Sequence, residues 1–216
     1  MYPSGKPALA ALVLLGVTGL LTLSGLISGC GTDGPTVITT GPSPTHAELR
    51  AAPTGLTWQR FQGIPIPRTQ QGPTIEEGPV AAGYEHSPRG SAVAAIQATV
   101  RISIADDIQW SRVVDRMVQP GVGRDQWATA RIQLSITEPV TSDRAPQILG
   151  YSLLAYTPDS ADVAIFTRQP DNSLTRNTAT VAWHDTDWLL VLPEDPDSTR
   201  VTAVPATPAD MVWLPL

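Results

Sequence analysis

The sequence has almost no cysteine. Only Cys30, among 216 residues, carries a thiol. One thiol cannot close a disulfide within the chain, and it cannot build a metal site that needs several thiolates. A disulfide-stapled scaffold and a multi-cysteine metal centre are therefore excluded, and the position of Cys30 beside a long apolar segment indicates another use.

Basic residues are scarce as well. The chain has one lysine, Lys6, and thirteen arginines against twenty acidic residues, and its net charge is −6. Binding to nucleic acid or to anionic lipid needs a basic stripe, whereas these arginines are dispersed along the chain. We therefore expect no nucleic-acid partner and no electrostatic attraction of the folded surface to a membrane.

The N-terminal segment has no acidic residue and, after Lys6, no charge at all through residues 7–28. It ends in Ile27-Ser28-Gly29-Cys30, which resembles the lipobox of bacterial lipoproteins. The resemblance implies that residues 1–29 are a signal peptide, that cleavage occurs before Cys30, and that Cys30 is the lipid attachment site. Two acyl chains on that residue suffice for stable membrane anchoring.

An uncleaved transmembrane helix is the alternative interpretation of the same segment. The uncharged run of 22 residues exceeds the roughly 7–15 of a signal-peptide core, and it is close to the ~20 that span a bilayer. Under either interpretation the rest of the chain lies on the extracytoplasmic face of the cell membrane, which the lone Lys6 weakly supports.

The segment after Cys30 changes composition twice. Residues 30–55 are rich in Gly, Pro and Thr and poor in apolar side chains, so we predict a flexible tether. Residues 56–86 contain more apolar side chains but also many prolines, which disfavour a helix. We predict an extended arm that lies on the domain and is anchored by Trp58 and Phe61.

A helix is predicted to begin at Ser87-Pro88, because serine is a favoured N-cap and proline a favoured first helical residue. Apolar residues then recur at spacings of three and four, as on one face of a helix of about 18 residues. They are Val93, Ile96, Val100 and Ile104. A second helix is expected after Asp106-Asp107, with an apolar face at Trp110, Val113, Val114 and Met117 and an end at Pro120-Gly121.

The pattern then changes to a period of two. Ala130, Ile132, Leu134 and Ile136 alternate with polar residues, which predicts a half-buried strand. Further strands are expected at 147–156, 161–168, 174–183 and 188–192. The loop 184–187 fits a four-residue hairpin that pairs Trp183 with Trp188.

Helices followed by a strand meander indicate an α+β domain over residues 87–193. We expect the N-terminal helices to pack on a curved, cone-like antiparallel sheet, with extended proline-rich arms on either side. The segment 194–216 is the second of these arms, a proline-rich tail that Trp213 docks on the sheet.

Several acidic residues, histidines and glycines are candidates for chemistry. They are Glu76-Glu77, Glu85-His86, Asp106-Asp107, the set His184, Asp185 and Asp187, and Gly121-Val122-Gly123. Acid–base groups must converge in a pocket, whereas neighbours in sequence more often act as caps, turn residues or solvated side chains. The glycine pair lacks the third glycine of a dinucleotide fingerprint and is interpreted as a loop. We predict no catalytic residue, no metal site and no cofactor.

Three stretches carry a resemblance to known proteins. WQRFQGIPIP (58–67), GYEHSPRGSAVAAIQATVRI (83–102) and ATVAWHDTDWLLVLP (179–193) resemble a family of uncharacterised actinobacterial envelope proteins that are often associated with mobile elements. More loosely, the order of elements is similar to the cone fold of nuclear transport factor 2 and ketosteroid isomerase. That fold also forms the extracytoplasmic domain of a conjugation-channel assembly subunit, although those subunits usually lack a lipobox.

These observations favour a non-enzymatic, membrane-anchored protein that binds an envelope protein partner or acts as an assembly component of a conjugation or secretion apparatus. The alternative is a lipoprotein that holds a small apolar ligand in a cone-shaped pocket lined by some of the six tryptophans. An isomerase-like or dehydratase-like enzyme would need an ionisable residue inside the cone, and no strand pattern clearly points one inward.

Overall fold

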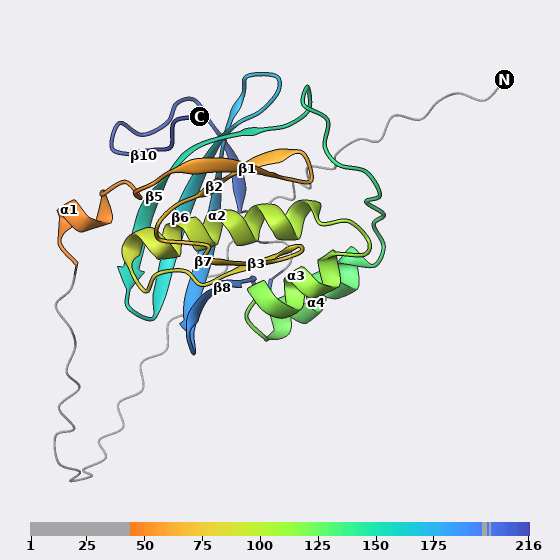
Figure 1. Ribbon diagram of the computed structural model, residues 1–216. Coiled ribbons are helices and arrows are strands. Elements are labelled where there is room, and N and C mark those ends of the chain that lie inside the picture. Colours follow the sequence, from red (N-terminus) through yellow and green to blue (C-terminus); the bar gives the residue numbers. More distant parts are fainter. Residues whose placement is uncertain (1–43, 196–197, 199) are drawn as a thin grey trace, which may run out of the picture. The chain divides into compact units, whose positions relative to one another are not determined.

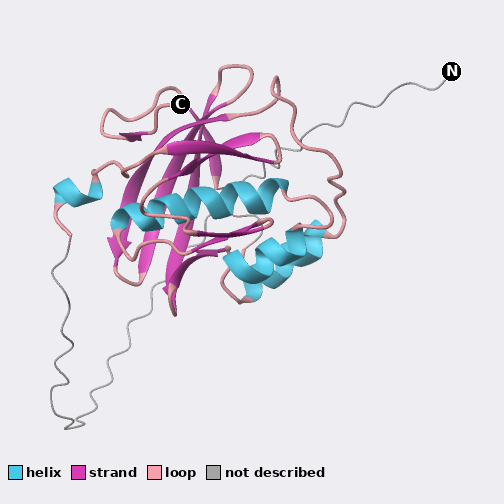
Figure 2. Ribbon diagram, in the orientation of Figure 1, coloured by secondary structure: helices cyan, strands magenta, loops and turns pink. Residues whose placement is uncertain are grey.

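The computed structural model describes residues 44–195, 198 and 200–216 (Figure 1). The predicted signal peptide 1–29, Cys30 and the first part of the predicted tether lie outside the described residues. Within the described part, helices and antiparallel strands combine in one α+β domain, as expected (Figure 2). No helix of this part combines the length and the apolar character needed to cross a bilayer.

A six-stranded antiparallel sheet forms one layer of the domain. Four consecutive strands of this sheet confirm the predicted meander: β5 (Gln147–Thr157), β6 (Ser160–Arg168), β7 (Leu174–His184) and β8 (Asp187–Val191). Trp183 and Trp188 face each other across β7 and β8, as predicted. The loop between these strands is shorter than the expected four residues, because His184 pairs with Asp187 and only two residues remain in the turn.

Helix α2 (Pro88–Ile104) lies across one face of this sheet (Figure 1). Ser87 is the N-cap and accepts a hydrogen bond from the Gly90 N–H at 3.1 Å, as the sequence predicted. Small side chains let the surrounding elements approach the helix closely. At Gly90 a Cβ atom would lie 1.9 Å from the Glu85 carbonyl oxygen, so no larger residue fits there. Val93 and Ile96 are fully buried, whereas Val100 is half-buried.

The predicted extended arm 56–86 instead folds into two β-hairpins that pack against α2. Their strands are β1 (Thr57–Phe61), β2 (Ile64–Arg68), β3 (Ile75–Glu77) and β4 (Val80–Ala82). Phe61 and Ile66 are buried in the same core as α2. Trp58 is half-buried, and its indole Nε1 donates a hydrogen bond to the Pro215 carbonyl at 2.8 Å. Proline is tolerated in β2 because only one side of that strand is paired.

The predicted strand over 130–136 is wrong. Helix α3 (Trp110–Met117) ends as expected, but α4 (Val122–Arg131) occupies the segment interpreted as a glycine loop and the beginning of the strand. Ile132 and Leu134 then lie exposed in a loop. Apolar and polar residues do alternate in this segment. However, Arg131 is bonded to the carbonyl at the end of α2, and the apolar side chains of Ile132 and Leu134 after it do not pack into the core.

Both ends of the domain are more ordered than predicted. Part of the expected tether forms α1 (His46–Leu49), whose N-cap Thr45 and third helical residue Glu48 make a capping box. Two unpredicted strands, β9 (Val201–Val204) and β10 (Val212–Trp213), pair with β7 and β5. Trp213 lies in β10, so the tail docks on the sheet as expected, but the Trp213 side chain is 49% exposed and the side chains of Val212 and Leu214 are buried instead.

A buried arginine joins α2 to both hairpins. The Arg101 side chain is 2% exposed, and its Nη2 donates to Glu76 Oε1 at 3.0 Å. Its Nη1 donates to the Pro79 carbonyl at 2.9 Å, and its Nε donates to Gln97 Oε1 at 2.9 Å. The guanidinium carbon also lies 4.6 Å from the centre of the Phe61 ring. Burial lowers the pKa of Arg101, and nearby Tyr84 and Glu76 oppose that shift.

We expect Arg101→Met to destabilise the domain by about 3 kcal/mol, because Gln97 and the Pro79 carbonyl lose their buried donor and Glu76 loses its buried ionic partner. Urea unfolding followed by circular dichroism measures the change. Arg112→Met is the matched control, because its pair with Glu77 is exposed. Equal stability of the two variants would contradict the role assigned to Arg101.

Candidate functional site

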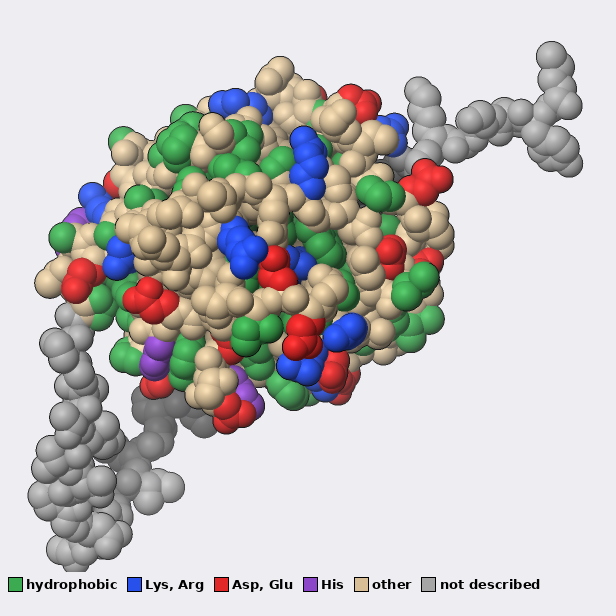
Figure 3. Space-filling view, viewed as in Figure 1, with side chains coloured by type: hydrophobic (Ala, Val, Ile, Leu, Met, Phe, Trp, Pro, Cys, Tyr) green, Lys and Arg blue, Asp and Glu red, His purple; other side chains and the backbone are tan. Residues whose placement is uncertain are grey.

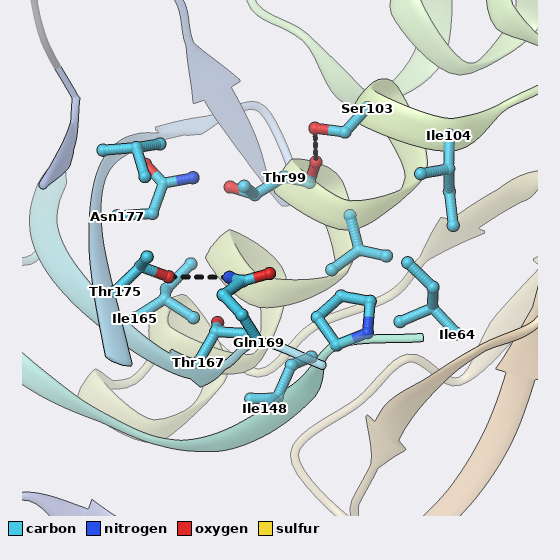
Figure 4. Close-up of a pocket in the computed structure, with 13 residues that line it drawn as sticks. Ile64, Thr99, Ser103, Ile104, Ile148, Ile165, Thr167, Gln169, Thr175 and Asn177 are labelled. Carbon is cyan, nitrogen blue, oxygen red and sulfur yellow. Dashed lines mark hydrogen bonds between the residues drawn. The ribbon is translucent and has the colours of Figure 1, made fainter. Parts of the chain in front are cut away.

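A pocket of about 240 Å³ opens between the C-terminal half of α2 and the sheet (Figure 4). Its apolar wall is formed by Val100 and Ile104 of α2, Ile64 of β2, and Ile148 and Ile165 of the sheet. None of the residues that line the pocket is charged. The volume is slightly below the roughly 300 Å³ at which ligand pockets usually begin, so the pocket suits a small, uncharged molecule.

Hydroxyl and amide groups form the other wall of this pocket. The Thr99 Oγ1 atom is buried and has no hydrogen-bond partner in the described structure. On the sheet side, Gln169 Nε2 donates to Thr175 Oγ1 at 2.9 Å (Figure 4). A buried hydroxyl without a partner costs free energy, so Thr99 is positioned to bond a polar group that enters the pocket. The lining contains no carboxylate, imidazole or amine that could act as a general base.

The structure brings together two of the predicted candidate groups, Glu85-His86 and the β7–β8 turn. The His86 ring stacks on Trp183 with a centroid separation of 3.9 Å and an interplanar angle of 8°. The Trp188 Nε1 donates to the Glu85 carbonyl at 3.0 Å. These contacts fasten the segment before α2 to the sheet, so this cluster is structural.

The carboxylate of Asp187 binds the backbone of the segment before α2. It accepts hydrogen bonds from the N–H groups of Gly83 and Tyr84, at 2.7 and 3.1 Å. Burial raises the pKa of Asp187, and those two N–H groups oppose the shift. The His184 Nδ1 atom lies 3.2 Å from Oδ2 of the exposed Asp185. Among the described residues no three His, Cys, Asp or Glu side chains are arranged to hold a metal ion.

The paired carboxylates separate in the structure. Glu76 faces Arg101, whereas Glu77 turns to the exposed Arg112 at 3.6 Å. Asp106 accepts hydrogen bonds from the Ile108 and Gln109 N–H groups, both at 2.9 Å, and so shapes the turn before α3. Neither pair converges on a pocket as an acid–base pair must.

A second buried arginine organises the end of the domain near α3 and α4. Arg131 is 3% exposed, and its Nη2 donates to Asp107 Oδ1 at 3.1 Å and to the Ala105 carbonyl at 3.0 Å. Its Nη1 donates to the Leu134 carbonyl at 2.8 Å. Asp107 also accepts a hydrogen bond from the Ile136 N–H at 3.0 Å. Among the interactions that lower the pKa of Asp107, this hydrogen bond has the largest effect. Sequence analysis missed this arginine because it lies inside the wrongly predicted strand.

Apolar side chains stand exposed around this arginine. Ile108 is 90%, Ile132 71% and Leu134 62% exposed, and the half-buried Trp110 lies beside Arg131, whose guanidinium carbon is 5.7 Å from the centre of the Trp110 ring. We call these four residues the apolar end surface. Trp110, Ile132 and Leu134 line an open depression of about 330 Å³ whose other lining residues include Asp107 and Arg131. A depression that combines a tryptophan, two aliphatic side chains and an arginine paired with an aspartate has the composition of a protein-binding hot spot.

Comparison with known proteins gives one match. The family described as "Domain of unknown function (DUF8175)" matches residues 31–211. No curated protein and no solved structure matches the chain. The matched range contains the pocket, both buried arginines and the apolar end surface, so these features lie within the shared domain.

Proposed function

The chain belongs to the DUF8175 family, and we propose that it is a membrane-anchored extracytoplasmic protein that binds protein partners and catalyses no reaction. We place it as an assembly component of a conjugation or secretion apparatus in the bacterial envelope. The apolar leader and the lipobox-like Ile27-Ser28-Gly29-Cys30 support the anchor. The family match begins at residue 31, directly after Cys30, which supports a boundary between leader and domain at that point.

The apolar end surface is the observation that carries the proposed binding role. A monomeric soluble protein rarely exposes several large aliphatic side chains side by side, and such a patch marks an interaction site. Arg131 and Asp107 satisfy each other beneath it, so a partner does not have to leave an unpaired charge buried. On the face drawn in Figure 3, basic and acidic side chains are interspersed rather than gathered in a basic stripe, which favours a protein partner over nucleic acid.

We also propose that the sheet curves into the cone-like form of nuclear transport factor 2. The position of α2 across the meander and the Trp183–Trp188 pair support that likeness. Fold likeness alone does not assign a function, so the binding role rests on the apolar end surface.

The anchor is tested by the mass of the mature N-terminal peptide from membranes. We expect a peptide that begins at a diacylated Cys30, because the lipobox-like sequence directs cleavage before that residue. A peptide that still begins at Met1 and stays in the membrane would identify the uncleaved helix, and an unmodified chain in the cytosol would contradict both anchors.

We expect the double variant Ile132→Ser and Leu134→Ser to lose its partner in the cell. A photo-crosslinking amino acid at the exposed Gln133 reports the contact, and the partner adduct should fall by at least about tenfold, as for a hot spot. Leu154→Ser is the matched control, because Leu154 is 56% exposed on β5 and lies outside the apolar end surface. Equal amounts of the partner adduct in the wild type, the double variant and Leu154→Ser would contradict the binding role of the apolar end surface.

The pocket under α2 favours a second candidate function, the binding of a small uncharged ligand. Its apolar wall and the unpartnered Thr99 hydroxyl support a ligand with an apolar body and one polar group. The rest of the space between α2 and the sheet is filled by core side chains such as Val93, Ile96 and Val163. The ligand would therefore occupy only the space beside the C-terminal half of α2, and not a continuous tunnel under the whole helix.

We expect Val100→Phe to weaken binding of the neutral dye N-phenyl-1-naphthylamine by at least about tenfold, because the added ring fills the pocket. Fluorescence titration measures the affinity. Val122→Phe is the control, because Val122 is exposed on α4. Unchanged affinity in Val100→Phe, with an unchanged melting temperature, would place the dye elsewhere and remove the support for this candidate.

A further inference from the structure

The segment that follows α4 runs along the edge of the domain as a loop up to β5 (Figure 1). Residues 134–137 have neither helix nor turn conformation. Ile136 is fixed on its inner side, where its N–H donates to Asp107 Oδ1 at 3.0 Å and its carbonyl accepts from the Asp107 N–H at 3.0 Å. The Leu134 carbonyl likewise turns inward to Arg131. The segment therefore lies against the domain as a strand lies against its neighbour, through every second residue.

The peptide groups of the intervening residues face the other way. In an extended chain the N–H and C=O groups of successive residues point to opposite sides. Within the described residues no hydrogen bond joins the backbone N–H or C=O of Ser135 or Thr137. These groups form a short, open strand edge beside the exposed Leu134. An open edge of this kind is a template for pairing with another strand.

We propose that a second copy of this chain occupies this edge, through an antiparallel pair of residues 134–138 related by a twofold axis at Ile136. This inference rests on the proposed function, because it names the first protein bound at the apolar end surface. Ser135 of one copy lies opposite Thr137 of the other, and both residues use their outward N–H and C=O groups. The two Ile136 side chains meet at the axis, and each Leu134 packs diagonally against the other copy's Ile136.

The composition of the edge favours self-pairing. Glu138 is the one charged residue of 134–138, and the twofold register places it opposite Leu134 of the other copy, so two copies do not place like charges opposite each other. Pro139 cannot donate to a ladder and ends the edge after one short register. Each copy offers one such edge and the twofold pair uses both, so the assembly closes as a dimer and does not grow into a fibre.

The mature, full-length protein in detergent tests this proposal by sedimentation and by hydrogen exchange. We expect a dimer, with amide exchange at Ser135 and Thr137 slowed at least tenfold as protein concentration rises. The Ile136 amide is already bonded to Asp107 and should not change. We also expect Ile136→Cys to form an intermolecular disulfide under mild oxidation and the exposed control Leu154→Cys to form none.

Each other outcome contradicts a definite part of the account. A dimer without protection at Ser135 and Thr137 overturns strand pairing. A monomer at all concentrations, with Gln133 still crosslinking to a different protein in cells, overturns the second copy as occupant but leaves the proposed function standing. A monomer with no cellular adduct overturns both.

Discussion

The domain depends on a charged side chain placed where charge is most costly. Arg101 projects from the most enclosed helix of the fold and is 2% exposed. An arginine cannot give up its proton to escape that cost, so its donors must be satisfied by the surrounding structure. They are satisfied by Glu76 and the Pro79 carbonyl from one hairpin and by Gln97 of the helix itself. The hairpin that supplies these acceptors must therefore dock on α2 before the arginine can be buried.

A second buried arginine acts in the same way just beyond the C-terminal end of the same helix. Arg131 gathers Asp107 and the carbonyls of Ala105 and Leu134, and in doing so it fixes the loop after α4 against the domain. The polar groups beneath the apolar end surface are mostly satisfied internally, although the Arg131 Nε remains without a partner in the described structure. The aliphatic side chains of the apolar end surface are exposed and do not pack into the core. An arrangement in which most polar groups bond within the domain and apolar groups face outward supports the proposed binding role.

Local patterns correctly predicted those helices and strands in which the periodic apolar residues are the ones that are buried. The β5–β8 meander and the capped start of α2 were correct because alternation, turn residues and the Ser87-Pro88 cap all indicated the same structure. The prediction of a strand over 130–136 was wrong. A period of two shows that apolar and polar side chains alternate, but it does not show that the apolar side chains are buried. The hairpins of 57–82 were missed because their prolines indicated an unpaired chain, although each strand needed pairing on one side only.

The candidate sites were harder to predict than the fold. Asp106 was correctly interpreted as a cap or turn residue, whereas Glu76 and Asp107 bind buried arginines that the sequence did not reveal as their partners. The apolar end surface was hidden inside a segment assigned to the core. Gln97 and Arg101, four residues apart in a largely apolar helix, were the one signal that could have revealed the buried network. Arg131 had no comparable signal, because Ala105 and Asp107 lie more than twenty residues away in sequence.

The claim that Arg101 makes the hairpins and the sheet one unit can be tested directly by native-state hydrogen exchange. The account predicts that the amides paired between β1 and β2, and between β3 and β4, exchange with the same free energy and the same denaturant dependence as those of β6 in the centre of the sheet. The account would be contradicted if the hairpin amides exchanged by a separate local opening whose free energy is several kcal/mol lower than that of the sheet amides.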